Sequence, residues 1–174
     1  MDDVAVPGPT ATPGPAIRPG ARPGVRLGID VGSVRVGVAV SDPAGLLATP
    51  VETVRRSGQR RADLERIAVL VREVAAVEVV VGLPLSMSGA RGRAAETALE
   101  YSRELAALIA PVPVRAFDER LSTVSAHAHL HGAGVRSRAR RDLVDQAAAV
   151  IILQSALDAE QASGRAPGEV VMAP

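Results

Sequence analysis

The 174-residue chain contains no cysteine, no tryptophan and only one phenylalanine and one tyrosine. The absence of cysteine excludes a disulfide framework, cysteine-ligated zinc and thiol catalysis. All 20 basic residues are arginine, which excludes any mechanism that needs a lysine nucleophile, a Schiff base or a phosphate-loop lysine. Two aromatic residues are too few for a platform on which bases stack. Because the net charge is only +1, any surface that binds nucleic acid must come from local clusters of arginine.

The composition divides the chain into three parts. Six of the 13 prolines fall within residues 1–24, so this Pro/Gly-rich segment is predicted to be a disordered tail. Residues 25–162 are predicted to form one domain, whose core must be filled by Val, Ala, Leu and Ile. Residues 163–174 are predicted to be a flexible tail. No signal peptide and no membrane span are recognisable, so we expect a cytoplasmic protein with no membrane partner.

The hydrophobic pattern of the domain predicts an α/β fold. Strands are predicted at 27–31, 34–40, 46–53, 78–82 and 112–117, and helices at 64–75, 94–108, 121–131 and 138–160. Pro50 places the third strand at an edge of the sheet, because proline cannot donate to a strand ladder. The strand at 78–82 is apolar on both faces, as a central parallel strand would be. This order predicts an antiparallel meander that continues into a parallel sheet.

Asp30 is a carboxylate inside an otherwise apolar strand, which ends at a Gly-Ser turn with Arg35 just beyond. An ionised carboxylate there costs several kcal/mol unless a cation or a metal compensates it. Because side chains alternate along a strand, Asp30 shares its face with Gly28 and Gly32, and the next strand places Gly37 on the equivalent face. A face without bulky side chains lets a backbone, a metal or a phosphate approach closely. Asp30 therefore predicts the start of a site.

Asp118 and Glu119 follow the predicted strand at 112–117, at the carboxyl end where open α/β sheets bind their ligands. Asp118 alone is also a favoured helix N-cap. Adjacent residues at a strand end point in different directions, so the two carboxylates cannot have the same role. We expect Asp118 to cap or orient and Glu119 to reach the site, although the sequence leaves the reverse assignment open.

Asp145 lies on the last predicted helix, just before a stretch that is apolar on all sides from Ala147 to Leu153. It therefore lies at the edge of the core. At 100° per residue, Arg138, Arg141 and Asp145 lie within about 60° of one another. An intrahelical pair between Arg141 and Asp145 is the alternative to a site, and it contributes only a few tenths of a kcal/mol.

Arginines crowd the start of this helix, where the macrodipole disfavours cations. They are Arg136, Arg138, Arg140 and Arg141. This pattern indicates an external anion such as a phosphate backbone, which guanidinium groups bind bidentately. A solvated, arginine-rich turn is the alternative.

Three acids on separate elements beside a basic helix start suit two-metal hydrolysis of a phosphodiester bond. In such sites carboxylates hold a pair of Mg²⁺ or Mn²⁺ ions roughly 4 Å apart, which activate water and stabilise the leaving oxygen. Asp30, one of the pair Asp118 and Glu119, and Asp145 are the acids that would form such a site.

Four ordered motifs resemble the YqgF (RuvX-like) family between about residues 25 and 160. They are the runs from Asp30 to Asp42, from Val81 to Pro84, from Asp118 to Thr123 and from Val144 to Leu153. The resemblance implies a ribonuclease H-like fold, with helices flanking a five-stranded mixed sheet in the order 3-2-1-4-5. It also implies a metal-dependent nuclease, either a Holliday-junction resolvase homologue or a processor of the 5′ end of pre-16S ribosomal RNA.

The same resemblance carries residue roles to this chain. Asp30, Glu119 and Asp145 would be the catalytic and metal-binding acids, and Arg35 and Arg120 would be motif arginines near the substrate. Arg138 and Arg141 join them as predicted substrate contacts on the phosphate argument above. Members of the family often carry lysines before the last aspartate. This chain has Arg140-Arg141-Asp142 instead, so Asp142 adds a negative charge among these contacts.

We therefore expect an Mg²⁺- or Mn²⁺-dependent endonuclease that acts on structured RNA or branched DNA, as a monomer or a homodimer. Processing of the 5′ end of pre-16S rRNA is the favoured activity, and resolution of Holliday junctions is the first alternative. A second alternative is a non-catalytic nucleic-acid-binding factor in transcription or ribosome assembly. Such a factor would keep the arginines and not depend on the acids, because phosphate contacts alone supply binding.

Two further patterns are weaker. His127, His129 and His131 alternate, but they have no cysteine and no evident third ligand beside them, so they do not predict zinc. The run from Asp30 to Ser33 also resembles the first phosphate loop of actin-like ATPases and sugar kinases. Those proteins need a second domain and a later glycine-rich motif, and neither is recognisable in this sequence.

Overall fold

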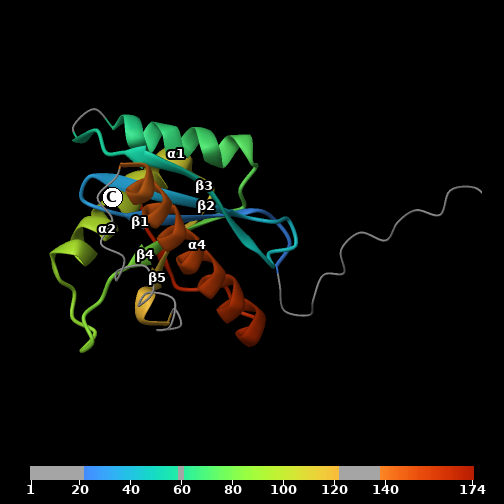
Figure 1. The fold of residues 1–174 in the computed structure, drawn as a ribbon. Helices are drawn as coiled ribbons and strands as arrows, with labels where there is room; N and C mark the ends of the chain where they lie inside the picture. Colours follow the sequence, from blue (N-terminus) through green and yellow to red (C-terminus); the bar gives the residue numbers. More distant parts are fainter. Residues whose placement is uncertain (1–21, 59–60, 122–137) are drawn as a thin grey trace, which may run out of the picture.

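A computed structural model describes residues 22–58, 61–121 and 138–174, with side chains from residue 144 onward in the last range. In this part of the chain, six strands form one sheet in the order β3-β2-β1-β4-β5-β6 (Figure 1). Their bounds are β1 Arg26–Val31, β2 Arg35–Ser41, β3 Ala48–Arg55, β4 Glu78–Leu83, β5 Val114–Asp118 and β6 Glu169–Val171. The first three strands are antiparallel neighbours, and β1, β4 and β5 are parallel. The predicted meander that continues into a parallel sheet is confirmed.

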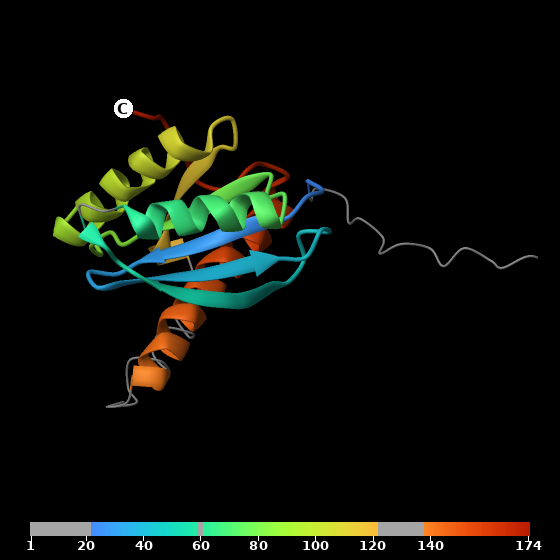
Figure 2. The ribbon, with the colours of Figure 1, turned by 90° about the horizontal axis from the view of Figure 1, so that it is seen from above.

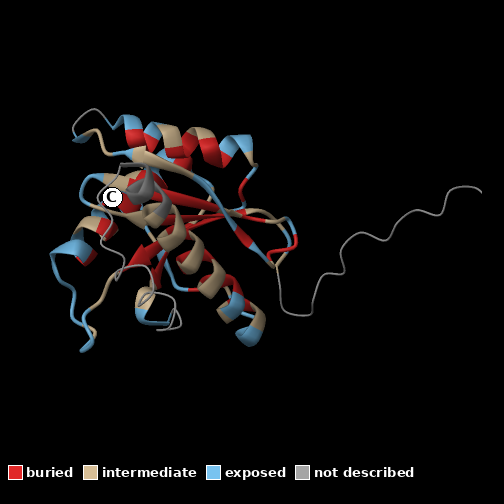
Figure 3. Cartoon of the chain, viewed as in Figure 1, coloured by how far each residue is buried: buried red, intermediate tan, exposed pale blue. Residues whose placement is uncertain are grey.

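Helices cover both faces of the sheet (Figure 2). They are α1 Ala62–Glu73, α2 Arg93–Ile109 and α4 Arg138–Ser163, with a short 3-10 turn, η2, at Glu119–Leu121. The helices α1 and α2 pack on one face, and α4 crosses the other. The central strands β1, β2 and β4 are mostly buried, whereas the edge strands β3 and β6 are largely exposed or half-buried (Figure 3). None of the described helices is both long and apolar enough to cross a membrane.

The predicted alternation of β1 and β2 is also confirmed. Leu27, Ile29, Val36 and Val38 are fully buried in the core that α1 and α2 cover. The opposite side of the same strands packs on α4, where Ala39 contributes to a second core. Asp30 therefore lies on the α4 face, one residue before the end of β1. Pro50 lies in β3, which is an edge strand as expected.

The sequence predicts five strands, and the structure adds a sixth. β6 pairs antiparallel with β5, so three residues of the predicted C-terminal tail form a strand. Three residues between a glycine and the chain end are too short for a periodic pattern, and the free edge of β5 supplies the pairing that orders them. Most of the predicted N-terminal tail, all of the predicted helix at 121–131 except its first residue, and the three histidines lie outside the described residues.

A buried ionic cluster joins the chain at the end of the sheet remote from Asp30. Arg26 and Glu160 lie 3.0 Å apart, and both are almost completely buried. Arg22 donates to Glu160 at 2.9 Å and to Glu78 at 2.7 Å, and Arg115 donates to Glu78 at 2.6 Å. These contacts tie the residues before β1 to the start of β4 and to the end of α4. Each buried carboxylate is thus paired with a guanidinium, as burial of charge requires.

Candidate active site

Three glycines bring α4 against the sheet. A Cβ added at Gly28 would lie 2.5 Å from Cβ of Leu153, and one at Gly82 would lie 2.5 Å from Cδ1 of Ile152. A Cβ at Gly37 would collide with the backbone carbonyl of Asp145. Glycine at these positions lets the helix approach to backbone distance. The glycine-lined face predicted from the sequence is therefore the surface on which α4 packs.

Packing of α4 on this surface brings Asp145 toward Asp30. Asp30 is paired in register with Gly37 on the adjacent strand β2, and the carbonyl of Asp145 lies directly over Gly37. Nη1 of Arg35 is 4.0 Å from Oδ2 of Asp145, and both side chains are partly exposed. Two acids that are 115 positions apart along the chain thus flank one glycine.

Asp118 and Glu119 face opposite sides of the sheet. The backbone N–H of Arg120 donates to Oδ1 of Asp118 at 3.0 Å, and Nη2 of Arg120 donates to Oδ2 at 2.6 Å. These hydrogen bonds from Arg120 hold the pKa of Asp118 below its usual value, against the effect of burial. Asp118 therefore orients Arg120 and the turn that follows, as predicted.

Glu119 points to the α4 face. Its Oε1 is 2.5 Å from the place where a Cβ of Gly82 would lie, so Gly82 leaves room for this carboxylate. Burial raises the pKa of Glu119 to about 7, and the negative charges of Asp30 and then of Asp118 add to the effect. The effect of the Asp30 charge is consistent with the backbone geometry, which places both carboxylates on the α4 face of the sheet.

The donor set fits a divalent cation. Carboxylate oxygens are the ligands that Mg²⁺ and Mn²⁺ prefer, and a cation held by Asp30 and Glu119 would offset the burial and the repulsion that together raise the pKa of Glu119. Among the described residues, however, no three Asp, Glu, His or Cys side chains stand close enough together to form a ligand set. The structure brings Asp30 and Glu119 together and places Asp145 beside them on the same face. The assignment of all three as metal ligands stays a prediction.

A family model described as RuvX, Holliday junction resolvase, matches residues 24–159. The chain belongs to the RuvX family. Two curated relatives carry the name "Putative pre-16S rRNA nuclease". One, from Kineococcus radiotolerans, is 54% identical over 88% of this chain and 81% of its own length. The other, from a Nocardioides species, is 57% identical over 86% of this chain and 97% of its own length.

A solved structure shares the fold of this RuvX chain. It is Thermus thermophilus RuvC in complex with a Holliday junction substrate, with a TM-score of 0.52 and 18% identity. The match covers 83% of this chain and 99% of that one. At this identity the likeness shows the fold, which is ribonuclease H-like as the resemblance implies. Together with the family match, the relatives establish this RuvX chain as a nuclease.

The predicted substrate arginines of the RuvX chain have different surroundings. Arg35 lies beside Asp145, at the acidic site. Arg120 lies on Asp118 and also donates to the carbonyl of Met87 at 3.4 Å, so it faces the loop between β4 and α2. The side chains of Arg138 and Arg141 lie outside the described residues, although both belong to the first turn of α4.

Sequence reasoning missed the role of Gly82. The motif Val81-Gly82-Leu83-Pro84 is recognisable, but nothing in it says that a carboxylate and a helix meet over the glycine. The signal was present in the strand pattern, because a glycine in a central β-branched strand marks a close approach of another group.

Proposed function

We propose that this RuvX nuclease is a divalent-metal-dependent endonuclease that processes the 5′ end of pre-16S rRNA. One observation carries the catalytic part of the proposal. Asp30 and Glu119 lie close enough for the charge of one to raise the pKa of the other, at the carboxyl ends of parallel strands where this class of fold binds ligands. Two carboxylates on one face repel each other, and a divalent cation held by both would offset that repulsion.

Each residue then has a chemical task. Asp30, Glu119 and Asp145 would hold Mg²⁺ or Mn²⁺, which when bound lowers the pKa of a coordinated water and neutralises charge on the reacting phosphate. Arg35, beside Asp145, is placed to bind a phosphate oxygen of the substrate as a bidentate donor. Gly28, Gly37 and Gly82 keep α4 seated so that Asp145 stays on the same face as the other two acids.

The substrate proposal rests on the relatives. Those from Kineococcus and Nocardioides, which this chain covers for most of their length, are named for the ribosomal RNA precursor. A second candidate is cleavage of four-way DNA junctions, which the description of the family model favours. Phosphate and metal contacts are common to both, so the substrate must be determined by assay.

The test is a cleavage panel with the full chain and Asp30→Asn. The substrates are a pre-16S rRNA 5′ fragment, a four-way DNA junction, a linear duplex and a single-stranded RNA, each with Mg²⁺, Mn²⁺ or a chelator. We expect metal-dependent cleavage of the rRNA fragment and a loss of roughly 100-fold or more in Asp30→Asn, equivalent to about 2.7 kcal/mol of transition-state stabilisation.

Glu73→Gln on α1 is the matched control, since Glu73 is an exposed acid whose contact with Arg66, at 3.6 Å, lies on the surface. It loses the same charge and should cleave at the parental rate. Cleavage by Asp30→Asn at the parental rate would refute the proposal that the acidic site is catalytic. Retention of RNA binding without any cleavage by the parent would favour the non-catalytic alternative.

A further inference from the structure

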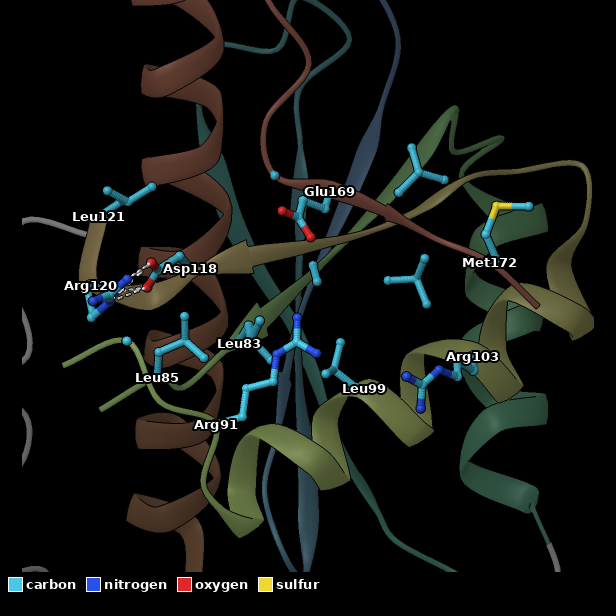
Figure 4. Close-up of a pocket in the computed structure, with 15 residues that line it drawn as sticks. Leu83, Leu85, Arg91, Leu99, Arg103, Asp118, Arg120, Leu121, Glu169 and Met172 are labelled. Atoms are coloured by element: carbon cyan, nitrogen blue, oxygen red, sulfur yellow. Dashed lines mark hydrogen bonds and ion pairs between the residues drawn. The ribbon is translucent and has the colours of Figure 1, made fainter. Parts of the chain in front are cut away.

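A cavity of about 640 Å³ lies on the face of the sheet that α4 does not cover (Figure 4). Its walls come from the ends of β4 and β5, from α2, from the loop between β4 and α2, and from the segment that contains β6. This volume is within the range of about 300–1,000 Å³ typical of small-molecule sites. The cavity is therefore large enough to hold one ligand unit.

The cavity and the acidic site share the ends of β4 and β5. Asp118 lines the cavity, whereas the adjacent Glu119 points to the α4 face. Leu83 and Gly82 divide in the same way, because Leu83 lines the cavity and Gly82 faces α4. Side chains of consecutive residues point to opposite faces, but their Cα atoms are only about 3.8 Å apart. A chain-like ligand that crosses these strand ends can therefore contact both places.

The lining combines an apolar surface with arginine. The apolar part includes Leu83, Leu85, Leu99, Val171 and Met172. Arg91 and Arg103 extend from the α2 side toward the cavity, as Figure 4 shows. Both are exposed, and neither makes an ion pair or a side-chain hydrogen bond with any residue of the described ranges. Two guanidinium groups beside an apolar wall suit a ligand that has an anion and a flat, mostly apolar face.

The loop between β4 and α2 positions Arg91. Leu85 and Arg91 form an antiparallel bridge, and the turn between them is closed by the Gly89 N–H, which donates to the Ser86 carbonyl at 2.8 Å. Gly89 has a φ of +84°, which favours glycine. Nη1 of Arg120 donates to the carbonyl of Met87 and so joins this turn to the end of β5. Arg91 is thus held by a closed turn.

Acidic groups also line the cavity, and they define where an anion can bind. Asp118 is neutralised by Arg120, with the closest contact at 2.6 Å. Glu169 lies on the β6 side, and Arg91 and Arg103 lie on the α2 side (Figure 4). The three arginines and two acids leave one positive charge, concentrated near α2. An anionic group is therefore favoured beside Arg91 and Arg103 and disfavoured near β6.

We propose that this cavity takes one unpaired nucleotide of the nucleic-acid substrate, with its phosphate on Arg91 and Arg103 and its base against the apolar wall. The choice of a nucleotide as the ligand rests on the proposed nuclease function. It adds a substrate class, because a base held in a duplex cannot enter without being unstacked and extruded. The substrate should therefore carry a single-stranded or extruded nucleotide beside the cleaved bond.

The experiment measures binding in the presence of a chelator, so that no cleavage is needed. The probes are a labelled single-stranded RNA dodecamer and the same RNA in a blunt duplex. The test protein is Arg91→Gln/Arg103→Gln in the full chain, and the control is Arg66→Gln/Arg72→Gln on α1, which loses the same charge. Thermal melting first establishes that both variants fold.

Loss of two phosphate contacts should make the plot of log binding constant against log salt concentration less steep by about 1.4 for the single strand. We also expect the affinity for the single strand to fall roughly tenfold relative to the control. Duplex binding should match that of the control. The proposal is overturned if the test variant binds the single strand as the control does, or if the parent does not bind it at all. It is also overturned if single strand and duplex weaken equally, or if only the sedimentation of the protein changes, which would assign the cavity to a second copy. Cleavage by Asp30→Asn, by contrast, refutes the acidic site without altering these binding results.

Discussion

Replacement of Glu119 by glutamine should stabilise the metal-free protein at high pH and not at low pH. Its pKa is raised from 4.5 to about 7, mainly by burial and then by the charge of Asp30. A rise of this size corresponds to about 3.4 kcal/mol against ionisation in the folded state. The side chain is partly exposed, so solvent screening reduces the expected effect to about 2 kcal/mol.

The sign follows from linkage. The folded state binds the proton of Glu119 more tightly than the unfolded state, so stability is full below pH 4.5 and falls as the pH rises through about 7. Glu119→Gln removes this loss. At pH 8 in a chelator, the variant should be about 2 kcal/mol more stable than the parent, or roughly 4–8 °C higher in melting temperature. At pH 4.5 the two should melt together.

The assay is thermal melting of parent, Glu119→Gln and the exposed control Glu73→Gln at both pH values. Addition of Mg²⁺ should raise the melting temperature of the parent at pH 8 and narrow its gap from Glu119→Gln, since a bound cation favours the ionised carboxylate. An equal gain at both pH values, or none at pH 8, would refute the reasoning, because neither outcome is compatible with a carboxylate that ionises under repulsion.

Three other changes test the packing and the charges. Gly37→Ala should reduce cleavage and destabilise the fold by about 1–3 kcal/mol in urea titration, because the added Cβ would displace Asp145 and α4. Unchanged stability would mean that α4 does not pack on Gly37. Glu160→Gln should cost about 3 kcal/mol at pH 7, since Arg26 would keep a buried charge with one partner fewer; a cost below about 1 kcal/mol would contradict the buried pairing. Asp42→Asn should destabilise the fold at pH 7, because two backbone N–H groups hold the pKa of Asp42 below its usual value, despite burial. That stability is lost as the pH falls through the lowered pKa, so the destabilisation in urea titration should shrink toward low pH. Equal destabilisation at pH 7 and at low pH would exclude the charge as the cause.

Much of the fold could be predicted from local pattern. Strand alternation around Asp30 and the edge position of Pro50 depend only on side-chain direction and on a missing N–H, so a single sequence reveals them. The division of Asp118 and Glu119 between two faces has the same origin, and the structure agrees with it. Strand β6 could not be predicted, because its stability comes from the free edge of β5 and not from its own three residues.

Other features depend on residues that are distant in the sequence. Arg91 and Arg103 lie in a polar loop and on an exposed helix, where arginine is ordinary, and only the tertiary structure shows that both reach one cavity. The same holds for the contact between Arg22 and Glu160, which are 138 positions apart. Sequence periodicity gives the face of an element, but it does not give the neighbour across that face.

Charged residues have different surroundings at the two ends of the central sheet. At the end where β1 begins, the buried acids Glu78 and Glu160 each pair with a guanidinium group, that of Arg26 among them, so this cluster stabilises the fold. At the other end burial and the charge of Asp30 raise the pKa of Glu119, and this is where we propose the catalytic acids. An engineer who wants a more stable enzyme should therefore leave single members of the first cluster alone and exchange the whole cluster for apolar residues of matching volume.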